Sequence, residues 1–197
     1  MRFFYASLAI ALTSGFSSLA TEKPNILFVL FDDMGYGEPT SYRPASLFKT
    51  PNIDRMAKEG IRFMDAHSSA ASCTPTRYGF LTGRYPHRIG QFGVLSTFSP
   101  PLIPETRLTV ASYLKQNGYA TACIGKWHLG MNWGRPKIKG KDKAQKELKI
   151  GEKMTGGPNA IGFDYFYGFT HARNIQTIIE QDTVVKEVKP VENQPLM

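Results

Sequence analysis

A chain of 197 residues, of which 42% are hydrophobic and 12% aromatic, can bury one globular core, which excludes a wholly disordered protein. The formal net charge is +8. Much of this excess lies in residues 137–153, where seven lysines accompany three acidic residues without interleaved aromatic residues. This pattern argues against nucleic acid as a partner. It indicates a solvated surface loop with one or two helical turns, or a surface that attracts a polyanionic substrate.

The first 20 residues are typical of a secretory signal peptide. Arg2 gives a short positive start, residues 3–12 are almost entirely apolar, and small residues at Ser18 and Ala20 suit cleavage after Ala20. The apolar run is shorter than the roughly 20 residues that cross a bilayer, so a membrane anchor is the weaker interpretation. We therefore expect a periplasmic or secreted protein whose mature part is residues 21–197, with no membrane attachment after cleavage.

The mature chain alternates predicted strands and helices. Residues 25–31 (NILFVLF) form a continuous apolar run, which is typical of a strand buried on both faces of a parallel sheet. Thr50 and Pro51 are suited to cap and begin a helix that ends at Gly60. The remaining expected elements are strands at 61–67 and 119–124 and helices at 75–83 and 108–117. This order predicts an α/β fold with a mostly parallel sheet flanked by helices.

Polar residues lie at the ends of two of these segments and at the start of a third. Asp32 and Asp33 come after the first strand, residues 73–77 begin a helix, and Lys126 and His128 follow the last strand. Ligands of open α/β sheets bind at the carboxyl ends of strands, near helix N-termini. We therefore expect the three segments to converge on one pocket.

Asp32 and Asp33 are adjacent carboxylates after an apolar segment. Two such groups repel each other and lose solvation unless a cation or strong donors hold them. Oxygen ligands favour calcium or magnesium over zinc. An equally good interpretation is that one aspartate caps the turn at Met34–Gly35 and the other faces water.

Cys73 is one of two cysteines, and the other is Cys123. An even count in an exported chain favours a disulfide between them. Cys123 lies in an apolar strand, where a buried free thiol is common. Cys73 precedes a helix start and lies near Arg77, where negative charge is stabilised, as a nucleophile or an anion site requires. The residues alone leave both interpretations open.

Arg77, Lys126 and His128 offer a guanidinium, an ammonium and an imidazole. Together they match a tetrahedral oxyanion such as sulfate or phosphate. A single histidine is more often structural, and Trp127 between the two residues suits a core. The anion-site interpretation depends on all three cationic groups sharing one rim with Cys73.

The motifs taken together resemble the sulfatase family of the alkaline phosphatase superfamily. They are CTPTR at 73–77 followed by LTGR at 81–84, GYAT at 118–121 followed by GKWHLG at 125–130, the opening segment at 25–37, and a glycine-bounded segment at 162–168. They occur in family order over residues 24–168. Thr76 stands where the family most often has serine, so a hydroxyl is kept.

The resemblance implies a calcium-dependent sulfuric ester hydrolase of the arylsulfatase type with an alkaline phosphatase-like fold. In this family the cysteine matching Cys73 is oxidised to formylglycine by a separate formylglycine-generating enzyme. Asp32 and Asp33 would then bind calcium together with residue 73. Arg77 would hold the aldehyde hydrate, Lys126 would contact the sulfate and residue 73, and His128 would assist the second hydroxyl as it expels sulfate.

The resemblance also implies ligands downstream of Met197: a further histidine, a second pair of metal ligands and a second lysine. We therefore expect the N-terminal part of a catalytic domain, with an incomplete fold and activity that is uncertain without the rest. His171 lies too close to the segment at 162–168 to stand in for the missing histidine. The alternatives are a phosphonate or phosphodiester hydrolase of the same superfamily, and a noncatalytic secreted binder of sulfated polysaccharide.

Overall fold

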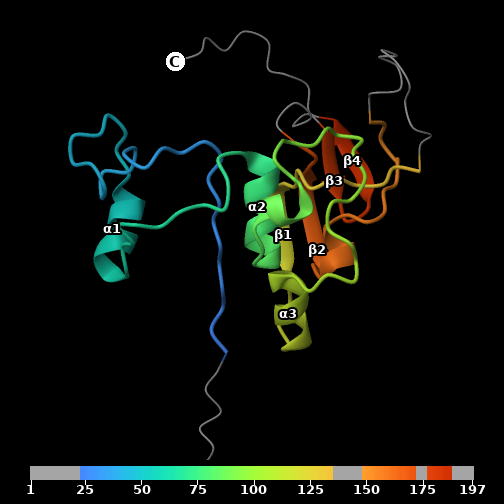
Figure 1. The fold of residues 1–197 in the computed structure, drawn as a ribbon, viewed down its shortest axis with the longest axis horizontal. Helices are drawn as coiled ribbons and strands as arrows, with labels where there is room; N and C mark the ends of the chain where they lie inside the picture. Colours follow the sequence, from blue (N-terminus) through green and yellow to red (C-terminus); the bar gives the residue numbers. More distant parts are fainter. Residues whose placement is uncertain (1–22, 135–147, 172–176, 188–197) are drawn as a thin grey trace, which may run out of the picture. The chain divides into compact units, whose positions relative to one another are not determined.

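The computed structural model describes residues 23–134, 148–171 and 177–187. The expected signal peptide at 1–20 and most of the lysine run at 137–153 lie outside these ranges. The chain divides into two units, residues 1–49 and 50–197. In the second unit the helices are α1 (Pro51–Glu59), α2 (Cys73–Thr82) and α3 (Val110–Gln116), with 3-10 turns at Pro86–Ile89 and Pro158–Ile161. Its strands are β1 (Ala122–Lys126), β2 (Tyr165–Phe169), β3 (Thr177–Glu180) and β4 (Thr183–Glu187) (Figure 1).

The predicted strand at residues 25–31 is absent from the structure. Its backbone belongs to none of the four strands, and its apolar side chains are exposed, up to 89% at Leu27. An apolar run becomes a strand only when neighbouring backbone satisfies its amide and carbonyl groups. No ladder among the described residues includes this segment. The first unit instead contains turns, in which the Ser46 hydroxyl donates to the Glu38 carbonyl (2.5 Å).

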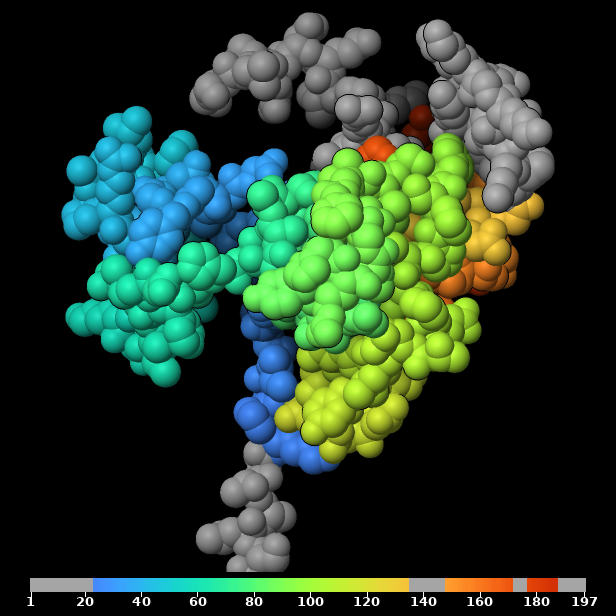
Figure 2. Space-filling view, in the orientation of Figure 1, coloured from blue at the N-terminus to red at the C-terminus, as the bar shows by residue number. Residues whose placement is uncertain are grey.

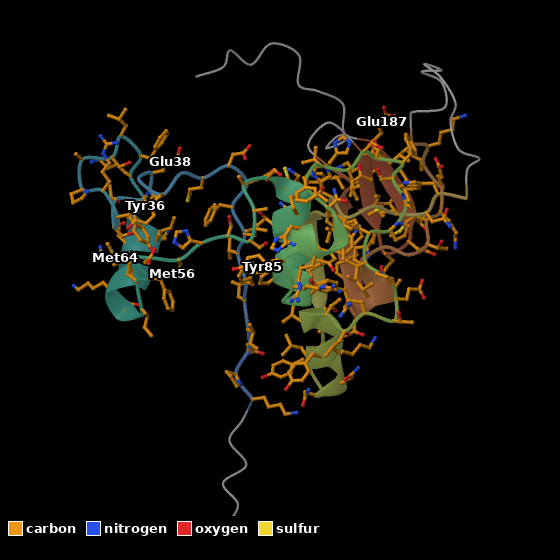
Figure 3. The ribbon with its side chains drawn as sticks, viewed as in Figure 1. Tyr36, Glu38, Met56, Met64, Tyr85 and Glu187 are labelled. Atoms are coloured by element: carbon orange, nitrogen blue, oxygen red, sulfur yellow. The ribbon has the colours of Figure 1, made fainter. Side chains whose placement is uncertain are left out.

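The predicted strand at residues 61–67 is also absent, and Ile61 and Phe63 are 80% and 66% exposed. The preceding helix is confirmed as α1, which buries none of its residues. Met56 on α1 and Met64 after it both carry exposed side chains (Figure 3). Thr50 lies at the N-cap position, but its hydroxyl donates to the Asp54 carboxylate (3.2 Å) instead of accepting a helix amide.

The four strands form one sheet in the order β1-β2-β3-β4. The expected parallel pairing occurs between β1 and β2, with Ala122 beside Tyr165 and Lys126 beside Phe169. The pairs β2/β3 and β3/β4 are antiparallel. Gly168 lets β1 and β2 approach, because a Cβ there would lie 1.9 Å from the Gly125 carbonyl oxygen. The α/β class is therefore confirmed for this partial fold, but its sheet is mixed instead of mostly parallel, with one parallel and two antiparallel pairings among the described strands.

One face of the sheet carries the hydrophobic core. Phe166 and Ile179 are fully buried there and cluster with Tyr78 and Leu81 of α2 and with Trp127. The segment that follows α2, green in Figure 2, contributes Ile103, Phe98 and Leu102 to the same cluster.

The opposite face carries alternate residues of the same strands. Ile124 is 67% exposed, and Tyr165 and Tyr167 are more than one-third exposed. Because successive side chains of a strand point to opposite faces, this alternation shows that the described residues cover the sheet on one side only. Of the helices expected to flank the sheet, α2 is the one whose residues join the core on the covered face.

Helix α3 is positioned by its first and last turns. Thr109 and Ser112 form a reciprocal capping box, and the Thr109 hydroxyl also donates to the Ile161 carbonyl (2.6 Å). Near its end Lys115 pairs with Asp164 (2.6 Å). Asp164 also accepts hydrogen bonds from the amide and the hydroxyl of Thr121, at 2.9 and 3.0 Å. These contacts attach the helix to the start of β1 and β2.

We expect Asp164→Asn to lower the melting temperature at pH 7. The hydrogen bond from Lys115, and then those from Thr121, hold the pKa of Asp164 below its ordinary value of 3.8. A depressed carboxylate pKa stabilises the folded state above that ordinary value, and this stabilisation is lost as the pH falls through the folded-state pKa. The difference from wild type should therefore shrink below about pH 4. Thermal unfolding between pH 3 and 7 measures it, with Glu105→Gln on an exposed loop as the control, and a difference independent of pH would contradict it.

None of the helices in the described ranges is long and apolar enough to cross a membrane.

Candidate active site

Cys73 is the first residue of α2, two residues earlier than the predicted helix start. Ser72 before it is extended, and the Ser72 carbonyl accepts the first helical hydrogen bond from the Thr76 amide (3.1 Å). The Cys73 side chain is half-buried, and both cysteines are free thiols in the structure. The structure therefore contains no disulfide between residues 73 and 123. The helix N-terminus beside Cys73 favours negative charge there.

Thr74 fixes the start of α2 against two other segments. Its side chain is fully buried. The hydroxyl donates to the His128 carbonyl (2.8 Å) and accepts from the Leu95 amide (3.1 Å). This buried hydroxyl both donates and accepts. Moving it would cost free energy, because the loss of either hydrogen bond would leave a backbone carbonyl or amide without that partner. Thr74 therefore brings the first turn of α2 to the segment that contains His128.

Arg77 makes a second connection between α2 and that segment. Its Nη1 donates to the Lys126 carbonyl at 2.6 Å. Burial raises the pKa of Cys123 to about 11, and the positive charge of Arg77 partly opposes this rise. Cys123 therefore remains a neutral thiol at pH 7, as a structural buried cysteine does. The guanidinium lies beside the end of β1, which carries Lys126, another residue of the predicted anion site.

Lys126, Trp127 and His128 continue the pairing of β1 with β2. The Trp127 amide donates to the Phe169 carbonyl (2.9 Å), and the His128 amide donates to the Thr170 carbonyl (2.7 Å). Trp127 is 3% exposed and belongs to the core, so its structural interpretation is confirmed. His128 has a φ of 56°, which is unusual for a residue other than glycine. Such strain is common at functional sites.

The His128 ring is held by a backbone carbonyl. Its Nε2 lies 2.8 Å from the Leu95 carbonyl oxygen, and the side chain is buried. A carbonyl can only accept, so Nε2 carries the proton. In the neutral ring Nδ1 is then the unprotonated nitrogen and can accept a proton. This tautomer suits a general base.

The loop at residues 95–102 was not identified from the sequence. Besides its contacts through Leu95, the Ser99 carbonyl accepts from the Met131 amide (3.0 Å), and the Leu102 amide donates to the Leu129 carbonyl (2.9 Å). Gly130 is needed for this close approach, because a Cβ there would lie 2.0 Å from the Pro100 carbonyl oxygen. No charged residue or recognisable spacing in the loop could have revealed this role.

Asp32 and Asp33 belong to the first unit, and both are exposed. Asp33 has a φ of 64°. In the turn that follows, the Gly35 amide donates to the Glu38 carboxylate (2.9 Å), so a glutamate, rather than either aspartate, accepts that amide. Carboxylate oxygens suit calcium. However, nowhere in the described ranges do three or more His, Cys, Asp or Glu side chains gather to hold a metal ion. Two carboxylates alone do not make a calcium site.

The second unit thus brings together, through α2 and the end of β1, four of the six predicted site residues: Cys73, Arg77, Lys126 and His128. A sulfatase family model matches residues 24–189. The chain belongs to the sulfatase family.

Similar proteins include two characterised sulfatases. An N-acetylgalactosamine-6-O-sulfatase of Bacteroides thetaiotaomicron is 39% identical over 74% of this chain and 26% of its own length. The human steryl-sulfatase is 45% identical over 78% of this chain and 24% of its own length. The chain therefore spans about a quarter of the length of these sulfatases.

Solved structures agree with this assignment. One, from work on the metabolism of multiple glycosaminoglycans by Bacteroides thetaiotaomicron, superposes with a TM-score of 0.70 at 34% identity. It covers 84% of this chain and 32% of the solved chain. Ps i-CgsB in complex with k-i-k-neocarrahexaose superposes with a TM-score of 0.56 at 28% identity, over 80% of this chain and 36% of the other. These similarities support the partial sulfatase fold.

Proposed function

We propose that this chain contributes the nucleophile-bearing part of the active site of an arylsulfatase-like sulfuric ester hydrolase. One observation carries the proposal. The first turns of α2 are bonded to the segment at 126–128 at two points, Thr74 to the His128 carbonyl and Arg77 to the Lys126 carbonyl. Residue 73 therefore belongs to the same rigid assembly as the cationic residues. Residues 21–197 would be the N-terminal part of the catalytic domain.

Formylglycine at position 73, made by a formylglycine-generating enzyme, would supply a hydrate hydroxyl as the nucleophile when present. Arg77 and Lys126 would offset the negative charge that develops on the sulfuryl oxygens. His128 would accept a proton at Nδ1, because Nε2 is occupied by the Leu95 carbonyl. These roles need cations that are positioned before the reaction, and the hydrogen bond from Arg77 to the Lys126 backbone carbonyl supports such positioning for Arg77.

Calcium belongs to the proposal only through the family resemblance, which implies Asp32 and Asp33 as ligands, and no role given to the second unit above depends on it. Because the described residues do not gather three such ligands, the site would need further oxygen ligands.

We further propose that the substrate is a sulfate ester, of which sulfated polysaccharide is one candidate class. The named relatives support this, since one is an N-acetylgalactosamine-6-O-sulfatase and one solved structure contains an oligosaccharide. Export to the periplasm or outside the cell, after removal of residues 1–20, is proposed on the composition of that segment.

The test is expression of the chain with a formylglycine-generating enzyme, followed by mass spectrometry and turnover assays. Trypsin releases residues 63–77, which contain Cys73. We expect an aldehyde at residue 73 and hydrolysis of an aryl sulfate in preference to an aryl phosphodiester. Cys73→Ala should abolish both the aldehyde and turnover, whereas Cys123→Ala should retain them.

Three results would count against the proposal. A disulfide to Cys123 would remove the nucleophile. Preferred turnover of the phosphodiester would favour the related phosphodiester hydrolases. An unmodified thiol without turnover, together with retention on a sulfated resin that is lost at high salt, would favour a noncatalytic binder.

A further inference from the structure

His171 lies beside His128, although the sequence gave no reason to include it in the site. It follows the end of β2 by two residues, and its side chain is half-buried. The centroids of the two imidazole rings are 5.2 Å apart, and the ring planes are inclined by 42°. The two rings are therefore neighbours in the folded chain.

The two imidazoles are held by the same short segment. His171 Nε2 lies 2.7 Å from the Thr97 hydroxyl, and His128 Nε2 lies 2.8 Å from the Leu95 carbonyl oxygen. These two contacts are only two residues apart in the chain. A displacement of Thr97 would therefore displace Leu95, and with it the acceptor that fixes the His128 tautomer.

The same segment is also anchored at both sides. The Leu95 amide donates to the Thr74 hydroxyl (3.1 Å), and the Thr97 carbonyl accepts from the Trp133 indole N–H (3.2 Å). Thr97 is 7% exposed. The Thr97–His171 hydrogen bond thus connects this segment with the residues that follow β2.

We propose that His171 is a positioning residue for His128. Through Thr97 it keeps the Leu95 carbonyl on Nε2 of His128, so that Nδ1 stays unprotonated and faces away from that carbonyl. The hydrogen bonds that the two ring nitrogens make decide which of them carries the proton. The catalytic meaning of this arrangement rests on the proposed function, in which His128 accepts a proton at Nδ1.

The test is nitrogen NMR of the 197-residue chain labelled with ¹⁵N-histidine. The chain has four histidines. In the wild type, His128 should show one dominant tautomer with the proton on Nε2. In His171→Ala and in Thr97→Val that dominance should be lost, and the two nitrogens should shift toward averaged values. His171→Gln should retain the wild-type shifts, because its amide can still hydrogen-bond to Thr97.

Two other histidines serve as internal references. His67 hydrogen-bonds to Asp65 (2.7 Å), and His87 stacks on Tyr85 with ring centroids 5.3 Å apart. Their signals should not change in any variant. If His171→Ala fails to fold, Thr97→Val decides the matter. Wild-type His128 shifts in folded Thr97→Val, or in folded His171→Ala, would overturn the proposal.

This readout does not depend on turnover. Changed His128 tautomers in a chain whose residue 73 stays an unmodified thiol without turnover would count against the proposed function and leave the positioning role intact. Unchanged tautomers in an active chain would refute the positioning role alone.

Discussion

Replacing Phe166 by alanine is expected to lower the free energy of unfolding of the second unit by about 3–5 kcal/mol. Phe166, the second residue of β2, is fully buried and packs against Trp127, with ring centroids 6.4 Å apart. Truncation would remove its transfer free energy and leave a cavity next to the segment that carries His128. A loss of this size is a large part of the roughly 5–15 kcal/mol by which domains are stable. Urea unfolding followed by tryptophan fluorescence measures it.

The matched control is Phe92→Ala. Phe92 belongs to the same unit but is 75% exposed, so the same truncation should change the free energy of unfolding by less than about 0.5 kcal/mol. Equal effects of the two substitutions would show that the sheet face packed with Phe166 is not the stabilising core.

The second large effect is expected for Arg77→Ala. The substitution removes the Nη1 hydrogen bond to the Lys126 carbonyl and a positive charge from the segment that links α2 to the end of β1. In a chain with aryl sulfatase turnover, the rate should fall by about 100- to 1,000-fold, as when a preorganised donor to a developing oxyanion is lost. Arg77→Lys should recover only part of the rate, because lysine keeps the charge but lacks the planar fork of donors.

A second readout of Arg77→Ala does not need turnover. Arg77 lowers the pKa of Cys123 against the larger effect of burial, which raises it to about 11. Without Arg77 that pKa should rise further. The pH dependence of alkylation in a Cys73→Ala background reports Cys123 alone, because the chain has two cysteines. Arg88→Ala, at an exposed position, is the control, and an unchanged or lower pKa in Arg77→Ala would contradict the placement of the guanidinium.

Local sequence signals located the helices well. Pro51 and Gly60 bound α1, and Gly83 ends α2 in the left-handed conformation with a φ of 62°. These signals act within one or two helical turns, so they do not depend on distant parts of the chain. The strand at β1 was also predicted, although it begins at Ala122 instead of residue 119.

The predicted strands at 25–31 and 61–67 were wrong for the opposite reason. Apolar composition favours burial, but a strand requires a partner whose backbone completes its hydrogen bonds, and composition does not provide one. Both segments are exposed and outside the sheet among the described residues. Counting cysteines likewise could not decide whether Cys73 and Cys123 form a disulfide, because pairing depends on the distance between the two residues in the fold.

The sequence by itself determined the family and the residue types of the candidate site, because the motifs around Cys73 and Lys126–His128 are contiguous and chemically distinctive. Only the tertiary structure decided which nitrogen of His128 is protonated, that Thr74 bonds to the His128 carbonyl, and that His171 lies beside the His128 ring and bonds to Thr97. Those contacts join residues 33 to 74 positions apart in the chain. Their hydrogen bonds exist only once the sheet, α2 and the loop at 95–102 have packed together, so no local pattern can encode them.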